Sequence, residues 1–271
     1  MTETVKSDAS LSVALVTDIH HGSDSAYVRG TVALPLLENA LREIAARKPA
    51  LLVDLGDRVN DSEPDTALAE LSEVAACFSK VDAPRQHLLG NHDITDRREQ
   101  ERILGGPLGN RSLELDGWQF VFLDTFDGSV EGELTPETLT WLERVLALND
   151  LPAVVFSHQP LDGQPLPGNL FFGGDYAYQA HPRGYEAARL VLERSGKVRL
   201  VVSGHAHWNH VVTVGNIDYL TLAAIAPHVG DEGGSYGLLV LDSEGARLEV
   251  YGSASWERQF EVVTKRSERQ V

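Results

Sequence analysis

The sequence has one cysteine and no long apolar run, and each absence excludes a class of protein. Cys77 stands alone, so no disulfide can form within the chain, and its apolar surroundings in LSEVAACF (71–78) favour a buried side chain over a nucleophile. No apolar stretch approaches the ~18 residues of a membrane span. The first residues, MTETVKSDAS, lack the basic segment and apolar core of a signal peptide. We therefore expect a cytoplasmic protein that does not enter a membrane.

Basic residues are also scarce. Lys and Arg number 23 against 40 Asp and Glu, which gives a formal net charge of −17 at pH 7. Binding to a nucleic acid polymer or to an anionic membrane surface needs clustered Lys and Arg, so neither partner is expected. A small anionic substrate stays possible, because a bound metal ion inverts the sign of the field inside a cleft.

Strands and helices alternate along the chain up to residue 204, and consecutive antiparallel strands follow residue 207. The expected strands span 11–17, 50–56, 85–90, 152–157 and 198–204, and a hairpin that turns at Asp116-Gly117 spans 112–125. The expected helices span 31–48, 63–80, 135–149 and 184–196. This pattern predicts an α/β fold of two packed sheets covered by helices. We expect one domain over residues 11–263, between flexible tails at 1–10 and 264–271.

Asp, Asn or His side chains stand at the ends of five of the expected strands. In α/β sheets, ligands gather beyond the carboxyl ends of the strands. The glycines before Asp57, Asn91 and His205 allow tight turns and a close approach of the backbone. We therefore expect the side chains at these strand ends to converge on one site: Asp18, His20, Asp57, Asn91, His92, Asp93, His158, His205 and His207.

This donor set indicates a metal centre. It mixes nitrogen and oxygen, which is too hard for copper(I) and too rich in nitrogen for magnesium or calcium, whereas zinc, manganese or iron fit. There are more donors than one ion needs, but two ions about 3.5–4 Å apart, with one carboxylate shared, would use them. Two divalent ions bring about +4 and two aspartates offset about 2, so the residual charge suits a hydroxide and a phosphate oxygen. The expected cofactor is a pair of divalent or trivalent ions of Mn, Fe or Zn.

The ordered motifs resemble those of the calcineurin-like metallophosphoesterases over residues 13–210. They are D-x-H (Asp18, His20), G-D (Gly56, Asp57), G-N-H-D (90–93), a lone His158 and G-H-x-H (204–207). The resemblance implies a four-layer αββα sandwich of two mixed β-sheets flanked by helices, with a dinuclear site at the C-terminal edge of the strands. It implies one metal held by Asp18, His20, Asp57 and His207, and a second held by Asp57, Asn91, His158 and His205. It also implies that His92 is the catalytic histidine, which stabilises phosphoryl charge or protonates the leaving group.

One position departs from the family pattern. Many members have an acid three residues after the shared aspartate, and that acid orients the catalytic histidine. This sequence has Asn60 there, with Asp61 beside it. An amide stabilises an imidazolium less than an acid does, so we expect His92 to be a weaker proton donor than in members with the acid.

Further candidates for contact with substrate or support of the ligands adjoin the motifs. Asp93 closes the G-N-H-D motif, and His21 adjoins His20, although its side chain should point away from the ligand. Trp208 and Asn209 follow the last ligand and either pack or line the substrate groove.

The segment 159–184 is the longest without predicted structure, and it follows His158 directly. Loops of this length in compact domains are functional or disordered. Its aromatic residues, Phe172 and Tyr176 among them, either stack on a nucleobase or pin the loop to the body of the protein.

The resemblance and the donor set together predict a metal-dependent phosphoesterase. Its expected substrates are small phosphorylated molecules, either phosphodiesters or nucleotide-type compounds, attacked by a metal-bridged hydroxide. A phosphomonoesterase with the same dinuclear site is the alternative, and a metal-binding scaffold without catalysis is a remote one. No pattern in the sequence indicates an oligomeric state.

Overall fold

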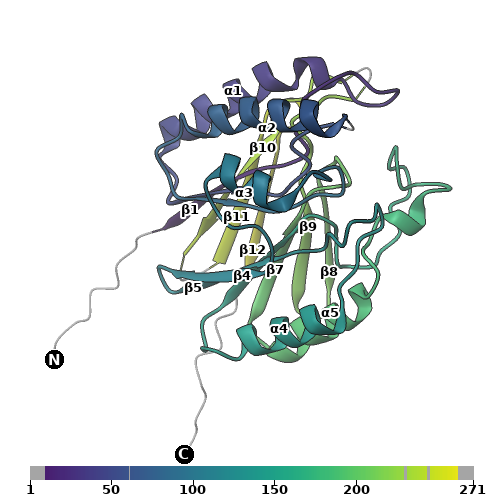
Figure 1. Ribbon diagram of the computed structural model, residues 1–271. Coiled ribbons are helices and arrows are strands. Elements are labelled where there is room, and N and C mark those ends of the chain that lie inside the picture. Colours follow the sequence, from purple (N-terminus) through teal and green to yellow (C-terminus); the bar gives the residue numbers. More distant parts are fainter. Residues whose placement is uncertain (1–9, 61, 229–230, 243–244, 262–271) are drawn as a thin grey trace, which may run out of the picture.

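Two six-stranded sheets lie face to face, and helices cover the outer face of each (Figure 1). The computed structural model describes residues 10–60, 62–228, 231–242 and 245–261. The expected four-layer αββα arrangement of two mixed sheets is therefore confirmed. Asp61 lies outside the described residues, and so do the two expected tails at 1–10 and 264–271, apart from Ser10.

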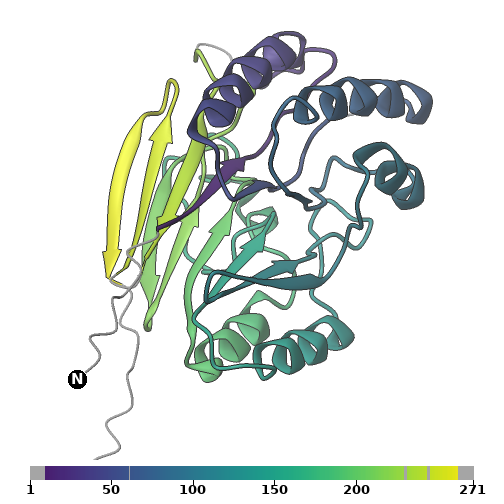
Figure 2. The ribbon, with the colours of Figure 1, turned by 90° about the vertical axis from the view of Figure 1, so that its left-hand side faces the viewer.

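The first sheet has the strand order β12-β11-β10-β1-β2-β3. β1, β2 and β3 run parallel, whereas β10, β11 and β12 join the sheet through antiparallel pairs. The C-terminal strands, yellow in Figure 2, form the edge farthest from β3. The strand bounds are β1 Leu11–Val16, β2 Leu51–Asp54, β3 Arg85–His87, β10 Tyr236–Leu241, β11 Gly245–Tyr251 and β12 Trp256–Glu261.

The second sheet has the order β4-β5-β6-β7-β9-β8. β5, β6, β7 and β9 are parallel, and β4 and β8 pair antiparallel at the two edges. The strands after residue 207, expected as one antiparallel run, therefore divide between the two sheets, and β9 lies parallel to β7. The bounds are β4 Arg111–Leu115, β5 Trp118–Leu123, β6 Ala153–Ser157, β7 Val198–Ser203, β8 His210–Val214 and β9 Ile217–Thr221.

Helices α1 (Ala33–Arg47) and α2 (Pro64–Phe78) cover the first sheet, and α4 (Pro136–Leu146) and α5 (Tyr185–Ser195) cover the second (Figure 1). Two short 3-10 turns, η1 (Gly30–Val32) and η2 (Ala177–Gln179), lie in the connections. Thr135 caps α4, since its hydroxyl accepts a hydrogen bond from the backbone N–H of Thr138. No helix in the described part of the chain is long and apolar enough to span a bilayer.

Helix α3 (Arg97–Leu104) is absent from the sequence-based expectation. Its sequence, RREQERIL, is almost entirely polar, and only Gln100 and Leu104 are buried, so it shows no apolar periodicity. The helix forms because Asp96 caps it, accepting hydrogen bonds from the backbone N–H groups of residues 98 and 99. Gly105, at φ 75°, ends it.

The largest apolar core lies between the two sheets. Alternate residues of each strand face this core or the helices; in β1, Val13 and Leu15 face the opposite sheet, whereas Ala14 and Val16 face α1 and α2. Burial on both faces explains why the central strands read as continuous apolar runs. The core fixes the parallel strands, and with them the loops at their carboxyl ends.

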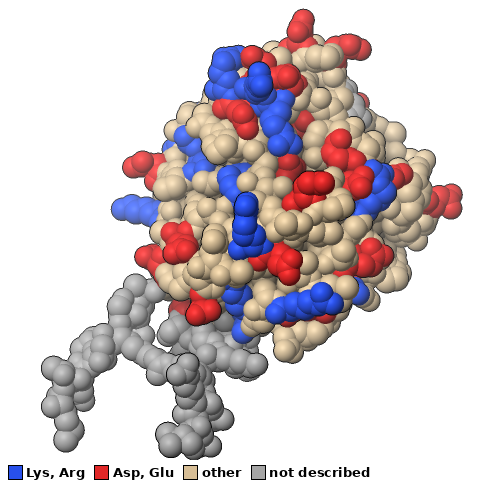
Figure 3. Space-filling view, turned by 60° about the horizontal axis from the view of Figure 1, so that its bottom comes forward, with Lys and Arg blue, Asp and Glu red and all other residues tan. Residues whose placement is uncertain are grey.

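The charged side chains are mixed on the face that turns forward from the bottom of Figure 1. On this face, Lys and Arg lie among Asp and Glu rather than in a separate basic patch (Figure 3). The ion pairs of Arg183 show the same mixing of charges among single side chains. Its guanidinium pairs with Asp127, Glu131 and Glu133 at 2.8–3.0 Å.

The stacked rings at the centre of the inter-sheet core give a test of its role. Phe120 is fully buried, with its ring centroid 6.0 Å from that of Phe156. We expect Phe120→Ala to lower the free energy of unfolding by about 3–5 kcal/mol, because it removes buried area and leaves a cavity. The matched control is Leu148→Ala at a side chain that is 69% exposed, with an expected change of about 0.5 kcal/mol or less. Urea unfolding measures both, and equal losses would contradict this account of the core.

Candidate metal centre

The loops that follow β1, β2, β3, β6 and β7 meet at one edge of the sheets. Each brings one or two of the expected donors, and all are buried, with exposures from 0% for Asp18 to 9% for His207. The structure brings together the seven candidate ligands named from the sequence: Asp18, His20, Asp57, Asn91, His158, His205 and His207.

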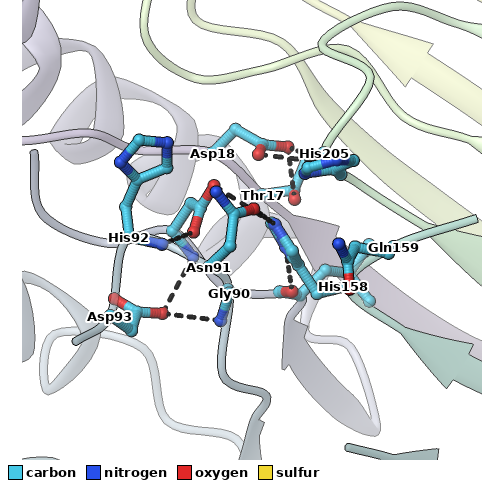
Figure 4. Close-up of polar contacts among 12 residues, drawn as sticks. Thr17, Asp18, Gly90, Asn91, His92, Asp93, His158, Gln159 and His205 are labelled. Carbon is cyan, nitrogen blue, oxygen red and sulfur yellow. Dashed lines mark hydrogen bonds and ion pairs between the residues drawn. The ribbon is translucent and has the colours of Figure 1, made fainter. Parts of the chain in front are cut away.

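These side chains form two groups of potential ligands that share Asp57. Within each group the ligand atoms lie within 4.8 Å of one another. Asn91 adjoins the second group, because its Oδ1 lies 3.1 Å from Nε2 of His158 (Figure 4). The first group is Asp18, His20, Asp57 and His207, and the second is Asp57, His158 and His205.

Donor atoms of neighbouring side chains face one another at short range. Nε2 of His207 lies 3.2 Å from Oδ1 of Asp18 and 3.1 Å from Nε2 of His20. Oδ2 of Asp57 lies 3.2 Å from Nε2 of His158 and 3.6 Å from Nε2 of His20. Buried carboxylates and imidazoles that converge from separate loops fit the needs of bound cations.

Backbone carbonyls fix two of the imidazoles. Nδ1–H of His158 donates to the carbonyl of Leu55 at 3.0 Å, so Nε2 is the ring nitrogen that faces Asp57 and Asn91 and is left to bind a cation once its proton is displaced. Nε2–H of His205 donates to the carbonyl of Gln179 at 3.0 Å, which leaves Nδ1 as its donor atom. Such a hydrogen bond sets the tautomer and orientation of a metal-binding histidine.

The backbone turns sharply at most of the donors. Only seven non-glycine residues in the described ranges have a positive φ, and five of them belong to the two groups. A spacing of two residues would bring both side chains of a D-x-H or H-x-H pair to one side of an extended segment. Here both members of each pair adopt the left-handed conformation instead. The five are Asp18 (51°), His20 (46°), Asp57 (56°), His205 (65°) and His207 (54°).

Glycines admit the carboxylates at two close approaches. A Cβ on Gly90 would collide with the carboxylate of Asp57, and a Cβ on Gly204 would collide with Thr17 and Asp18. The hydroxyl of Thr17 donates to Oδ2 of Asp18 at 2.7 Å. Glycine is therefore required here for space, in addition to its flexibility.

Asp93 joins the loop after β3 to the loop after β2. Its carboxylate accepts the backbone N–H groups of Asp57, Arg58 and Gly90 at 2.9–3.0 Å (Figure 4 shows the Gly90 contact). The guanidinium of Arg58 lies 2.6 Å from Asp93 and 2.6 Å from Asp54, and all three side chains are buried. This ion network holds the shared carboxylate in place from behind.

Electrostatics set the protonation of the donors. Burial raises the pKa of Asp18, but His207 and the other imidazoles outweigh it and lower the pKa to about 2. Burial lowers the pKa of His20 and of His205 to about 3, so both imidazoles are neutral at neutral pH. Against burial, the charge of Asp57 raises the pKa of His158 to about 9. A cation at this position therefore displaces a proton from His158.

His92 lies beside the donors at the protein surface. It is half-buried, and its backbone N–H donates to Oδ1 of Asp57 at 2.8 Å (Figure 4). Its ring centroid lies 4.9 Å from that of His20, at an interplanar angle of 72°. The imidazole is thus adjacent to both ligand groups and open to a substrate.

The side chains of Asn60 and His21 point in different directions. Asn60 lines the same pocket as His92, and its amide Nδ2–H donates to the carbonyl of Ser23 at 2.8 Å. His21 points away, with Nε2 2.6 Å from the carboxylate of Glu73 on α2. The structure thus places Asn60 at the pocket and His21 outside its lining.

A pocket of about 460 Å³ opens above the donors. Its floor includes Asp57, Asn91, His92 and three candidate ligand histidines, and its rim is apolar and aromatic. The rim residues come from three loops: Tyr27, Val130, Leu170, Phe171, Phe172 and Tyr176.

The aromatic residues at the rim differ in what they contact. Phe172 is buried and stacks on His205, with ring centroids 4.6 Å apart, so it pins the loop to a ligand. Phe171 packs edge-on against His207 at 5.0 Å. Tyr176 and Tyr27 are more than half exposed, at 58% and 56%, which leaves their rings open to a substrate.

Trp208 and Asn209 lie outside the lining of this pocket. Trp208 stacks on His210, with centroids 5.2 Å apart. Asn209 donates to the carbonyl of Ala254 at 2.7 Å and accepts the backbone N–H of Ala223 at 2.9 Å. Asn209 therefore holds the segments of Ala223 and Ala254 together, whereas Trp208 packs against the small apolar cluster that includes Leu166 and Phe172.

Two groups near the ligands gave little signal in the sequence. His228 lies with Nε2 3.1 Å from Nδ1 of His207, and burial lowers the pKa of His228 to about 4. It stands in a loop, outside every motif. Gln179 acts on His205 through its backbone carbonyl, which any residue type would supply.

Comparisons with known proteins agree with this geometry. The chain matches the calcineurin-like phosphoesterase family over residues 11–209. It is 27% identical to a probable cyclic nucleotide phosphodiesterase of Synechococcus sp., over 97% of both chains, and 25% identical to one of Psychrobacter arcticus, over 74% of this chain and 75% of that one. The fold resembles the crystal structure of a dimetal phosphatase from Danio rerio, with a TM-score of 0.77 at 15% identity over 93% of this chain and 98% of the other.

The span of the family match holds every candidate ligand and His92. Within it, two groups of buried donors share one carboxylate at the carboxyl ends of parallel strands, as a dimetal site requires. The chain therefore belongs to the calcineurin-like phosphoesterase family and is a metal-dependent phosphoester hydrolase.

Proposed function

We propose that this chain hydrolyses phosphodiesters of nucleotide type, with cyclic nucleotides as the first candidates, in the pocket above the donor groups. The relatives named as probable cyclic nucleotide phosphodiesterases support this substrate class, one of them over 97% of both chains. The composition of the pocket wall favours a diester over a monoester. Among the described residues, no Lys or Arg lines it.

The arginines nearest in sequence are engaged elsewhere. Arg58 is buried between Asp54 and Asp93, and Arg97 pairs with Asp124 at 2.7 Å. A phosphomonoester has a charge of about −1.5 to −2 at pH 7, whereas a diester has a single negative charge. Because the pocket wall has no cationic side chain, only the metal ions can offset the negative charge of a bound phosphate ester. A diester has the smaller charge, so it needs less compensation than a monoester.

We propose that two ions of Mn, Fe or Zn occupy the donor groups, because the mixture of imidazole nitrogen and carboxylate oxygen suits these metals. When bound, such ions lower the pKa of water and offset the charge of phosphoryl oxygens. The chain's own part is to hold the shared carboxylate of Asp57 between the groups. The proposed ligands are Asp18, His20, Asp57 and His207 for one ion, and Asp57, Asn91, His158 and His205 for the other.

His92 is the proposed catalytic residue, with the roles of holding a phosphoryl oxygen and giving a proton to the leaving oxygen. Its half-buried ring lines the pocket, and its backbone is tied to Asp57. We propose Asn60 as the residue that orients it. Because Nδ2 of Asn60 donates to Ser23, Oδ1 is the atom left to accept a hydrogen bond from the imidazole.

The exposed rings of Tyr27 and Tyr176 are the proposed platform for a nucleobase. They belong to separate loops, and the ring of Phe171 lies 5.9 Å from Tyr27 at the same rim. Stacking on exposed aromatic rings tolerates any base. We further propose a cytoplasmic enzyme acting on small substrates rather than nucleic acid polymers, supported by the net charge of −17.

The shared carboxylate predicts different metal losses for two variants. Asp57→Ala removes a ligand from both groups, so we expect the protein to retain less than one ion. His158→Ala removes a ligand from one group only, and we expect it to retain the ion of the other. Equilibrium dialysis against Mn²⁺ followed by elemental analysis measures the stoichiometry. Equal retention by the two variants would show that Asp57 is not shared.

Loss of the imidazole of His92 should affect turnover and leave metal content intact. We expect His92→Ala to lower kcat by about 10²–10⁴ on a diester whose leaving group needs a proton. His21→Ala is the matched control, because its side chain pairs with Glu73 outside the pocket. A fall of kcat by less than tenfold for His92→Ala, with metal content unchanged, would exclude the catalytic role.

The pocket wall predicts diester selectivity. With added Mn²⁺, we expect kcat/KM for bis-p-nitrophenyl phosphate to exceed that for p-nitrophenyl phosphate, because the wall has no cation for the second charge. A higher kcat/KM for the monoester would favour the phosphatase alternative, and no turnover of either substrate with metal bound would favour a scaffold.

The base platform is tested in the same assay by comparing Tyr176→Ala with wild type on a cyclic nucleotide and on bis-p-nitrophenyl phosphate. Stacking is worth about 1–3 kcal/mol per base, so KM for the nucleotide should rise roughly 5- to 150-fold. Tyr178→Ala, at an exposed ring outside the pocket lining, is the control. An unchanged KM would mean that the base does not bind on Tyr176.

A further inference from the structure

His228 stands directly behind the candidate ligand His207. Its Nε2 lies 3.1 Å from Nδ1 of His207, and the two rings are nearly parallel, at 11° with centroids 5.3 Å apart. Phe171 meets both rings edge-on, at 5.0 and 5.1 Å. The two imidazoles are thus in line and held from one side.

The proton on His207 has one compatible position. Its Nε2 faces Asp18 and His20, at 3.2 and 3.1 Å, so Nε2 is the atom that would supply a lone pair to a cation. The ring proton must then lie on Nδ1, and it needs an acceptor. Nε2 of His228 is that acceptor when His228 has its own proton on Nδ1.

The candidate ligand histidines differ in the hydrogen-bond partner of their outer ring nitrogen. His158 and His205 donate to the backbone carbonyls of Leu55 and Gln179, which no substitution removes. The outer nitrogen of His207, by contrast, faces a side chain, the imidazole of His228. A carboxylate or carbonyl usually has this role behind a metal-binding histidine, and here an imidazole has it.

The backbone around His228 is fixed independently of His207. His228 forms an antiparallel bridge with Val28, and the backbone N–H of Arg29 donates to the carbonyl of Pro227 at 3.0 Å. His228 and His207 both border a cavity of about 420 Å³ that Asp231 and Trp208 also line. Removal of the imidazole would therefore enlarge that cavity beside His207 and leave Nδ1 of His207 without its acceptor.

We infer that His228 is a positioning residue that fixes the tautomer and orientation of His207, and so strengthens cation binding by the group of Asp18, His20, Asp57 and His207. The inference rests on the metal centre of the proposed function and is independent of the substrate class.

Two substitutions separate hydrogen bonding from packing. His228→Leu removes the acceptor, and His228→Gln keeps one in its amide oxygen. We expect the Leu variant to bind one of two Mn²⁺ ions about 10–100-fold more weakly, and the Gln variant to recover most of that loss. His181→Leu is the matched control, a half-buried loop histidine outside the pocket lining, with wild-type affinity expected.

The measurement is equilibrium dialysis of metal-free protein against Mn²⁺, with circular dichroism to confirm folding of each variant. Wild-type affinity in the Leu variant would overturn the inference, and so would equal weakening in the Leu and Gln variants, which would indicate packing alone. No substrate is present, so a monoester preference would refute the proposed substrate class without touching His228. A wild-type chain that binds no Mn²⁺ would refute both.

Discussion

The buried ion network of Asp54, Arg58 and Asp93 is the constraint on which the centre depends. Three backbone N–H groups from two loops donate hydrogen bonds to the carboxylate of Asp93. The guanidinium of Arg58 lies between Asp93 and Asp54. Burying these charges costs several kcal/mol per ion unless each is paired and hydrogen-bonded, and here each is. The network therefore adds little net stability, and its effect is to fix the loop of Asp57 against the loop of Asn91 and His92 before any cation binds.

The same rigidity sustains a strained backbone. Five donors occupy the left-handed region, where a non-glycine residue costs of order 1–3 kcal/mol. The cores on both sides of each sheet hold the strands that lead into these turns, so the strain is supported by packing remote from the site. Donors held in this way lose little freedom when an ion binds, and this preorganisation favours affinity.

The sequence contained most of the fold and the donors, for physical reasons. Buried parallel strands read as apolar runs, and the donors stand where those runs stop, so residue type and position agreed. The sequence analysis did not predict helix α3, because the helix is defined by one N-cap and a terminal glycine and has no apolar face. The roles of His228 and of the Gln179 carbonyl could not be predicted, because they arise from contacts between loops that are distant in the sequence. The left-handed turns could not be predicted, because an extended D-x-H segment would also bring both side chains to one side, and the motif does not distinguish the two conformations.

The segment 169–179 serves both the rim and the cations. It supplies Tyr176 to the mouth of the pocket, stacks Phe172 on His205, and presents the carbonyl of Gln179 to the same imidazole. In the proposed function, substrate range and ion retention would thus depend on the same segment. A loop exchange intended to redirect selectivity should therefore weaken ion binding as well, because the same segment orients the imidazole of His205.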